Sequence, residues 1–367
     1  MADATLTQRQ LNRATLARQM LLERAEDVAV PAAVERLAGM QAQEPKHPFV
    51  GLWSRLAGFE AQALRRAVAQ REVVRATLMR STLHLFSAAD YAALRLALQP
   101  PMAVALRVLG ARAEGLDPDA VVAATRALLA GRPLTFDAIR AGLQERFPDV
   151  NDRALGYAAR TLVPLVMVPD AGARWGYPRV CEFGLAEELL DGPLAAAAPA
   201  ALVERYLGAF GPASAADVQT WAGVSAMRQV LDGMRGRLEV FADARGRELF
   251  DLPDAPRPGA DVEAPVRFLP EFDNLVLAYD DRTRVIADEH RPLVTTKNLR
   301  VKATFLVDGV VAGTWTLAVK RRVATVALEP FSSLPKPARA ALEREGEALA
   351  RFVEPEAAES EVRFAAS

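Results

Sequence analysis

The spacing of apolar and polar residues is most regular in the segment 214–252, where it predicts two helices and a hairpin. Ser214 is a favoured cap for the first helix, which Gly223 ends. Ser225 is the expected cap of the second helix. Alternating apolar residues before and after a turn with Gly246 then indicate a hairpin. Two helices with a short turn between them and a hairpin after them are typical of a winged helix-turn-helix.

The same order of elements recurs twice, with a weaker pattern. In the first segment, the pattern predicts helices at 5–24, 30–40, 46–57 and 60–70, followed by strands at 73–79 and 82–86. In the second segment, it predicts helices at 118–131, 135–146 and 151–165, followed by strands at 166–169 and 174–177. Because the segments share little sequence, they are repeated architectures and not a sequence repeat. Junctions are expected at Ala195–Pro199 and Pro256–Gly259.

From about residue 265 the pattern changes to strands. The expected strands are Val266–Leu269, Leu275–Tyr279, Val301–Val307, Val310–Val319 and Val323–Leu328. Asp308-Gly309 suits the tight turn of a hairpin, and a helix at about 335–352 closes the chain. These elements predict a small β-barrel or a curled sheet. Asp273, Asn274, Asp281 and Arg282 lie between strands, where we expect them to cap turns without a catalytic role.

Composition narrows the class of protein. The 367 residues suit two to four small domains, and a hydrophobic fraction of 51% is enough to form cores. Lys and Arg number 45 against 46 Asp and Glu, so any surface that binds nucleic acid must be local. The first residues, Met1–Thr5, show no secretory pattern, and the chain has no apolar run of membrane-spanning length. With Cys181 as its single cysteine, we expect a cytoplasmic protein.

Metal and nucleotide sites are not indicated. Histidine occurs only at His47, His84 and His290, and with one cysteine these give no ligand spacing for zinc. The chain also has no glycine-rich phosphate loop of the nucleotide-binding kinds. We therefore expect no cofactor and no zinc site, although a site made of carboxylates alone stays open.

The tripeptide Gln41-Ala42-Gln43 is the first candidate for chemistry. It follows the helical run 32–40, and Pro45 disfavours a helix just after it, so the glutamines lie where a helix ends or unwinds. Residues two apart point the same way in an extended segment, so both amides can converge on one point. An amide donates and accepts hydrogen bonds, and a pair can hold a water molecule. The alternative is two solvated glutamines at a helix end.

The second candidate is the segment Arg80–Phe86. As a strand, it places Thr82 and His84 on one face. His84 can contact a phosphate or a base, or transfer a proton near neutral pH. The alternative is a strand histidine that is hydrogen-bonded to a neighbouring carbonyl.

These segments resemble the AlkZ/YcaQ-like winged-helix DNA glycosylases. The matching pieces, in order along almost the whole chain, are Gln41-Ala42-Gln43, Arg80–Leu85, Arg267–Asn274, Asp308-Gly309 and Ala312–Trp315. The resemblance implies an α+β fold of three tandem winged helix-turn-helix domains and a small C-terminal β-barrel, arranged around a channel for DNA. The expected domains are 1–110, 111–195, 196–258 and 259–367, the last with the closing helix.

The resemblance also implies a reaction, which is hydrolysis of the N-glycosidic bond of alkylated purines, including the unhooking of interstrand crosslinks. The family's motif is glutamine, a hydrophobic residue, and then glutamine or aspartate, so Gln43 places this sequence nearer the AlkZ branch. An N7-alkylated purine leaves without much help from an acid, so the task left to the site is to position a water molecule. We expect Gln41 and Gln43 to do this, with His84 near the lesion.

Basic residues are the expected contacts to double-stranded DNA. Lys320-Arg321-Arg322 follows a strand and suits a phosphate clamp, or else a solvated turn. Arg80 and Thr82 are expected to contact DNA beside the motif, and Arg80 also ends a basic stripe with Arg65, Arg66, Arg71 and Arg75. We expect a monomer that needs no protein partner. The alternative function is a winged-helix regulator without catalysis, but the sequence shows no dimerisation helix for one.

Overall fold

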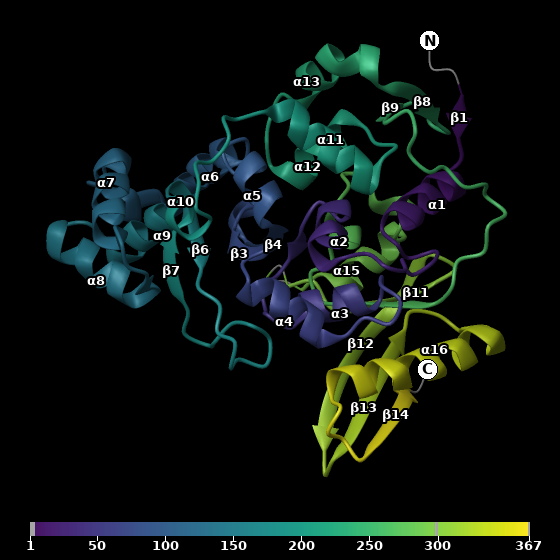
Figure 1. The fold of residues 1–367 in the computed structure, drawn as a ribbon. Coiled ribbons are helices and arrows are strands. Elements are labelled where there is room, and N and C mark those ends of the chain that lie inside the picture. The colour runs from purple at the N-terminus through teal and green to yellow at the C-terminus, as the bar shows by residue number, and fades with distance from the viewer. Residues whose placement is uncertain (1–3, 297, 299, 366–367) are drawn as a thin grey trace.

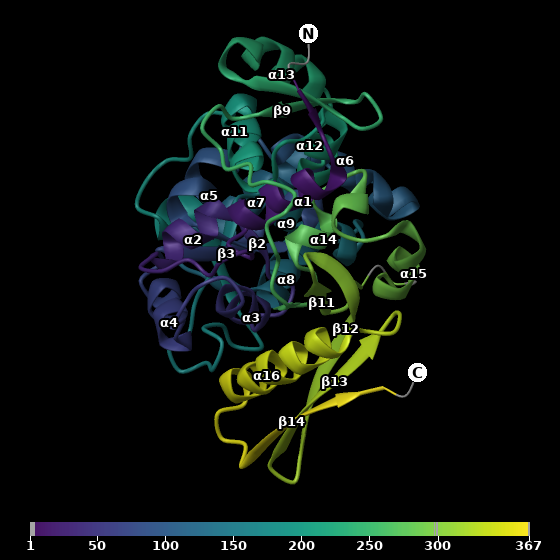
Figure 2. The ribbon, with the colours of Figure 1, turned by 90° about the vertical axis from the view of Figure 1, so that its right-hand side faces the viewer.

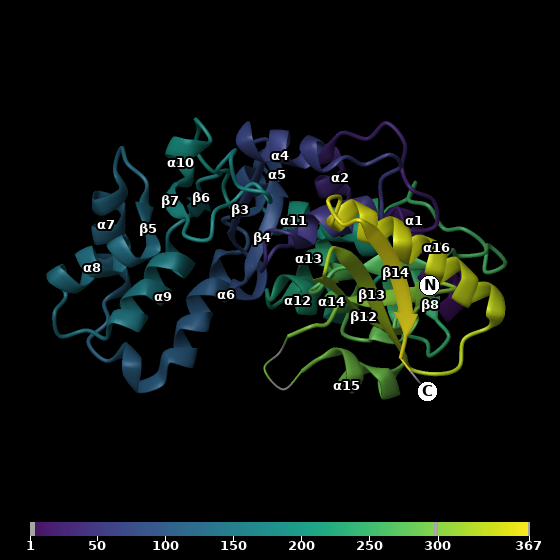
Figure 3. The same cartoon turned by 90° about the horizontal axis from the view of Figure 1, so that it is seen from below.

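The computed structural model describes residues 4–296, 298 and 300–365. Residues 1–3, on which the expectation about a leader segment partly rests, lie outside the described residues. The helices α7–α9 form a lobe at one end of the molecule, and the C-terminal sheet with α16 lies at the other end (Figures 1 and 3). A group formed by α11–α13 and its hairpin lies opposite the C-terminal sheet when the molecule is turned (Figure 2).

The first part of the chain contains the predicted helices, the two predicted strands as β3 and β4, and two further strands, β1 and β2. Its elements are β1 (Thr5–Leu6), α1 (Gln8–Arg18), α2 (Val30–Arg36), β2 (Met40–Gln41), α3 (His47–Trp53), α4 (Ala61–Ala69), β3 (Val73–Thr77), η1 (Met79–Ser81), β4 (Leu83–Ser87), α5 (Ala88–Leu94), α6 (Gln99–Val104) and η2 (Ala105–Ala113). Thr7 caps α1 in a capping box with Gln10. The helix stops earlier than predicted because Met20 adopts a left-handed φ of 55°.

The second part supplies the lobe and shares a sheet with the first. Its elements are α7 (Pro118–Leu129), β5 (Leu134–Thr135), α8 (Phe136–Arg146), α9 (Asp152–Leu162), β6 (Leu165–Met167), β7 (Glu182–Leu185) and α10 (Ala186–Leu189). The sheet has the order β2-β4-β3-β6-β7-β5, so it continues across the expected boundary after residue 110. The strand predicted at 174–177 is wrong, since that segment belongs to a loop whose Tyr177 hydroxyl accepts a 3.1 Å hydrogen bond from Arg75 N.

The third part matches its prediction closely. Its elements are α11 (Pro199–Phe210), α12 (Ala215–Ala222), α13 (Met227–Met234), η3 (Arg235–Arg237), β8 (Glu239–Asp243) and β9 (Glu248–Asp251). Ser214 caps α12 in a capping box with Asp217, and Gly223 ends this helix with a left-handed φ of 72°. The N-cap of α13 is Ala226 and not Ser225. β1 pairs in parallel with β8, so the hairpin becomes a sheet of three strands.

The C-terminal part is an open sheet, so the predicted closed β-barrel is wrong. Its elements are β10 (Arg267–Leu269), α14 (Asn274–Leu277), η4 (Arg282–Arg284), η5 (Asp288–His290), α15 (Arg291–Val294), β11 (Thr304–Val307), β12 (Val310–Lys320), β13 (Val323–Pro330), α16 (Lys336–Val353) and β14 (Glu359–Phe364). A barrel requires the first and last strands to pair, but the order β10-β11-β12-β13-β14 leaves β10 and β14 at opposite edges.

The helix α16 explains why this sheet stays open. It connects β13 to β14, which pair in parallel, and it buries Leu342, Leu349 and Val353 in one core with Phe268 and other side chains of the sheet. The run Leu275–Tyr279 forms the helix α14 and a following turn, and not the predicted strand. The hairpin at Asp308-Gly309 is confirmed, with left-handed φ at both residues. The number of winged-helix units and the boundaries between the four expected domains stay predictions.

Among the described residues, no single helix is long and apolar enough to cross a membrane. One bent pair of helices, Ala88–Leu94 with Gln99–Ala113, meets that criterion of length and composition when the two are taken together.

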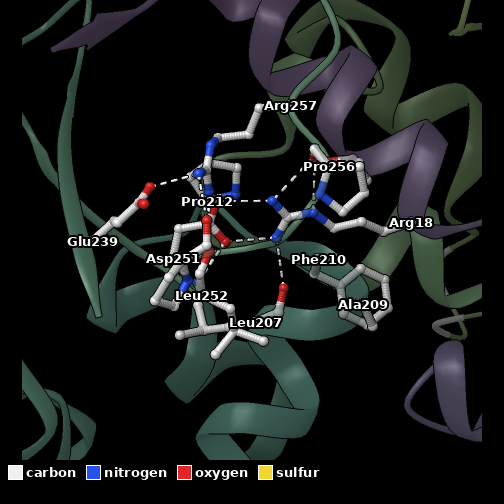
Figure 4. A network of polar contacts seen from close by, with 12 residues as sticks. Arg18, Leu207, Ala209, Phe210, Pro212, Glu239, Asp251, Leu252, Pro256 and Arg257 are labelled. Atoms are coloured by element: carbon white, nitrogen blue, oxygen red, sulfur yellow. Dashed lines mark hydrogen bonds and ion pairs between the residues drawn. The ribbon is translucent and has the colours of Figure 1, made fainter. Parts of the chain in front are cut away.

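A buried ion-pair network joins α1 to the third part of the chain (Figure 4). The Arg18 guanidinium donates to both oxygens of the Asp251 carboxylate at 2.7 and 2.8 Å, and to the Leu207 carbonyl at 2.7 Å. Arg257 donates to the same carboxylate at 2.6 Å and pairs with Glu239 at 2.5 Å. The Arg18 and Asp251 side chains are 1% and 0% exposed, so water cannot replace either partner.

We predict that Arg18→Met lowers the free energy of unfolding by about 3 kcal/mol, because the buried Asp251 carboxylate then keeps only its contacts with Arg257 and the Leu252 N–H. Denaturant unfolding of the full chain measures this. The matched control is Arg363→Met, which removes an exposed arginine from β14 and should leave the midpoint close to that of the wild type. Equal midpoints for the two variants would show that the network does not stabilise the fold.

Candidate active site

The glutamine motif lies in an extended segment beside a strand. After α2 the chain turns at Gly39, whose φ is 80° and whose missing Cβ leaves room for the Phe86 ring, which would lie only 2.0 Å from such an atom. The turn leads directly into β2, where Gln41 is opposite His84 of β4. The motif was expected where a helix ends or unwinds. The helix in fact ends at Arg36, five residues before Gln41, and Gln41 itself belongs to a strand.

Hydrogen bonds fix this extended backbone. Ala42 N donates to the Leu83 carbonyl at 2.8 Å. The buried Arg75 guanidinium donates to the carbonyls of Ala42 at 2.8 Å and Gln43 at 2.9 Å. Because alternate residues of an extended chain point the same way, Gln41 and Gln43 both reach one cleft.

That cleft, which we call the glutamine cleft, has a volume of about 600 Å³. The residues that line it are Gln41, Gln43, Glu44, Arg80, Thr82, Glu271, Phe272, Leu277, Asn298, Arg300 and Val301. One wall therefore comes from the β2–β4 region and the other from the segment around α14. The structure thus brings together four of the predicted site residues, which are Gln41, Gln43, Arg80 and Thr82.

Arg80 lies at a sharp turn between β3 and β4. Arg80 and Ser81 both adopt left-handed φ, of 53° and 57°, which is uncommon for residues with a side chain. This turn lets the Arg80 guanidinium donate to Gln41 Oε1 at 3.1 Å and to the Trp221 carbonyl of α12 at 2.7 Å. Burial, with a smaller effect from the nearby charge of Arg282, lowers the pKa of Arg80 to about 10, so it remains a cation at neutral pH.

His84 lies behind the cleft and does not line it. The side chain is fully buried, and its Nδ1 lies 3.1 Å from the Thr82 carbonyl. Burial, assisted by the charge of Arg80, lowers the pKa of His84 to about 3, so the ring is neutral at pH 7. This is the arrangement of a strand histidine bonded to a neighbouring carbonyl. Thr82 does line the cleft, but its hydroxyl already donates to the Met79 carbonyl at 3.2 Å.

The opposite wall carries a second charged group. Arg300 forms two hydrogen bonds with the Glu271 carboxylate, at 2.7 and 2.9 Å, so these two charges neutralise each other at the rim. Phe272, the next residue, has a left-handed φ of 60° and places this wall against the first part of the chain. His47 Nε2 lies 3.9 Å from the same carboxylate, but burial lowers the pKa of His47 to about 4.

Sequence analysis missed the residues that hold the two walls together. Asp273 caps α14, as a turn-capping role implies, but its carboxylate also pairs with Arg55 at 2.9 Å for each oxygen. Asn274 Nδ2 donates to the Gly39 carbonyl at 3.1 Å, just before the motif. The signal that could have found them is an acidic cap beside an amide in an otherwise apolar run. Asp281 also caps a turn, at the start of η4.

The other predicted DNA contacts lie apart from the glutamine cleft. Lys320-Arg321-Arg322 forms the exposed turn between β12 and β13, at the far end of the C-terminal sheet (Figures 1 and 2). The predicted arginine stripe is divided. Arg75 and Arg80 serve the motif, whereas Arg65 and Arg66 lie on α4 and line other hollows.

In the part of the chain that the structure describes, no group of three or more His, Cys, Asp and Glu side chains is arranged to hold a metal ion. The glutamine cleft offers amides, the Arg80 guanidinium, the Glu44 carboxylate and the neutralised ion pair of Arg300 with Glu271. Such groups can bind an anion and orient a water molecule.

Comparisons with known proteins identify the family and the fold. The model of the family described as "DNA glycosylase AlkZ-like" matches residues 34–352. The "Interstrand DNA cross-link repair glycosylase" of Streptomyces sahachiroi is 27% identical over 339 residues, which cover 87% of this chain and 89% of that protein. The solved structure of the Streptomyces sahachiroi DNA glycosylase AlkZ has the same fold. It aligns with a TM-score of 0.81 and 22% identity over 98% of this chain and 100% of that one.

We predict that His84 makes stability depend on pH. Its pKa is about 3 in the folded chain against 6.5 as the ordinary value, so below pH 6.5 the unfolded chain takes up a proton that the folded chain does not. The stability that depends on His84 is therefore fully present above pH 6.5. As the pH falls from 6.5 toward 3, the free energy of unfolding decreases by about 1.4 kcal/mol per pH unit.

Denaturant unfolding of the wild type and His84→Leu between pH 4.5 and pH 7.5 isolates this effect from that of the carboxylates. The difference in free energy of unfolding between the two proteins should change with pH below 6.5 and be constant above it. A difference that is constant throughout would mean that His84 is protonated in the folded chain as readily as in the unfolded one.

Proposed function

The chain belongs to the AlkZ-like family of DNA glycosylases, and on that premise we propose that it releases cationic, N7-alkylated purines from double-stranded DNA with Gln41 and Gln43 positioning the attacking water. The observation that carries this proposal is the opening of both amides into the glutamine cleft. Interstrand crosslinks through such purines are included among the proposed substrates, in line with the name of the Streptomyces sahachiroi relative.

The leaving group explains why neutral amides suffice. An N7-alkylated guanine is a cation, and when the C1′–N9 bond breaks it takes the bonding electrons and leaves as a neutral base. The sugar becomes an oxocarbenium-like cation, which accepts a lone pair from water at C1′, and the proton of that water passes to the solvent. The site must therefore orient water and tolerate positive charge, and a strong acid is not needed.

The two amides suit different halves of that task. Gln41 Oε1 accepts from Arg80, so its Nε2 is left as a donor, and it has no partner among the described residues. Gln43 is exposed, and its Oε1 has only a long 3.5 Å contact with Leu83 N. One amide that donates and one that accepts can hold a water molecule so that a lone pair faces the sugar. His84 acts in this proposal as a neutral support behind Gln41.

The DNA-binding surface is proposed to include the walls of the glutamine cleft at Arg80 and Thr82, with the Lys320-Arg321-Arg322 turn as a separate contact to phosphates. The turn is exposed, and its three side chains have no ion-pair partner among the described residues. We keep a monomer as the proposed active form, since both cleft walls come from a single chain.

We predict that Gln41→Ala and Gln43→Ala each slow base release by at least about 100-fold, because each removes one contact to the attacking water. The measurement is single-turnover release from duplex DNA with one 7-methylguanine, followed as abasic sites. Gln70→Ala is the matched control, since Gln70 is an exposed glutamine at the end of α4, and its rate should equal that of the wild type.

The wild type should also fail to release hypoxanthine, which is a neutral base and a poor leaving group without acid catalysis. If the wild type binds DNA with several cationic lesions tightly and releases none of them, the enzyme proposal is wrong, and a role as a DNA-binding protein replaces it. If the wild type releases 7-methylguanine and both alanine variants do so equally fast, the assignment of the two amides is wrong.

A further inference from the structure

Arg80 lines the glutamine cleft and faces no carboxylate among the described residues, a property that it shares with the buried Arg75, Arg95 and Arg284. Arg18 and Arg55 each form a two-pronged pair with an aspartate. Within the described residues, the hydrogen-bond partners of the Arg80 guanidinium are two neutral oxygens, the Trp221 carbonyl and Gln41 Oε1. A guanidinium has five N–H donors, so three remain available on a group that lines the glutamine cleft.

A second guanidinium lies close to the first. Arg282, at the start of η4, donates from Nε to the Tyr279 carbonyl at 3.3 Å and has no ion pair with any described residue. Its charge is near enough to lower the pKa of Arg80. Burial and the charge of Arg291 lower the pKa of Arg282 itself, and the nearby charge of Asp280 opposes this. Two partly buried cations that repel each other are stabilised by an anion that binds beside them.

The backbone adds an independent observation. The turn that carries Arg80 has two consecutive residues other than glycine in the left-handed region, at φ of 53° and 57°. Such conformations cost roughly 1 kcal/mol or more each and persist where the surrounding structure holds them in place, often at functional sites. Here the left-handed turn is what brings the guanidinium to within 3.1 Å of Gln41 Oε1.

We propose that Arg80, with Arg282 beside it, binds the backbone phosphate of DNA next to the nucleotide whose base is released. This inference rests on the proposed function and names the part of the substrate that the wall of the glutamine cleft holds. A phosphate accepts parallel hydrogen bonds from a guanidinium fork, and two guanidinium groups can share its charge.

The reaction itself favours an anion at this place. Positive charge builds up on the sugar in the transition state, and a bare guanidinium one hydrogen bond away from Gln41 would oppose it. A bound phosphate neutralises that guanidinium and adds a negative charge close to the sugar. Because Arg80 keeps its bond to Gln41 Oε1, the phosphate also fixes the orientation of the amide that faces the water.

The competing explanation is that Arg80 only clamps the η1 turn to α12 through the Trp221 carbonyl. In that case Arg80 matters for folding and for the shape of the cleft, but its effect on the rate is independent of the charge on the DNA backbone. The two explanations therefore differ in one measurable property, which is the coupling between Arg80 and a single phosphate.

The test uses duplex DNA with one 7-methylguanine in which the phosphates on either side are replaced, one at a time, by a neutral methylphosphonate. For the wild type, replacement at one position should slow single-turnover base release roughly 10- to 100-fold. Arg80→Gln should release the base more slowly than the wild type on natural DNA, to a similar extent. Replacement of that phosphate should slow this variant no further. Arg282→Gln should show a reduced sensitivity to the same replacement.

Arg344→Gln is the matched control, because it removes an exposed arginine from α16 and should keep the full methylphosphonate sensitivity of the wild type. The inference is overturned if no replacement slows the wild type, or if Arg80→Gln keeps the full sensitivity. If Arg80→Gln does not fold, as judged by its thermal unfolding, the same comparison is made with Arg282→Gln and decides the matter. Failure of the wild type to release 7-methylguanine at all would instead refute the proposed function.

Discussion

The ion pair between Arg55 and Asp273 determines where the glutamine cleft lies. Arg55 lies just after α3, which is the helix that follows the glutamine motif. Asp273 is the N-cap of α14, on the opposite side of the glutamine cleft. Their two hydrogen bonds of 2.9 Å are buried, and removing either partner would leave an unpaired charge in the interior. The pair thereby fixes the relative position of two segments that are more than 200 residues apart in the sequence. The hydrogen bond from Asn274 to the Gly39 carbonyl holds the segment just before the motif against the same wall.

The arginines of this chain fall into two groups with different consequences for DNA binding. Arg228 of α13 and Arg235 at the start of η3 are paired with Asp232 and Glu248, so the second helix of the best-predicted winged unit presents little net positive charge. The guanidinium of Arg80 has no such partner among the described residues. A net charge of −1 is therefore compatible with a DNA-binding protein, because unpaired positive charge can be local, as at the glutamine cleft and on the exposed Lys320-Arg321-Arg322 turn.

Local signals in the sequence predicted local structure well, and long-range pairing escaped them. Ser214 begins α12 and Gly223 ends it, as expected, because capping and left-handed turns depend on neighbouring residues. The open C-terminal sheet was mistaken for a barrel, because alternation along a strand is the same whether or not the edge strands meet. The family resemblance is confirmed, and the roles of the motif residues stay predictions. Asp273 has a local signal as an acidic helix cap, but no local pattern indicates that its partner is Arg55.

The neutrality of Gln41 acquires a physical reason from its surroundings. A carboxylate at this position would pair with Arg80 at once and would remove the one free guanidinium from the wall of the glutamine cleft. A charged histidine behind it would add repulsion, and the full burial of His84 keeps that ring neutral at pH 7. The amide instead accepts one hydrogen bond from Arg80 without cancelling its charge. The floor of the cleft therefore stays neutral where a cationic base would lie, and the positive charge beside it stays available for an anion.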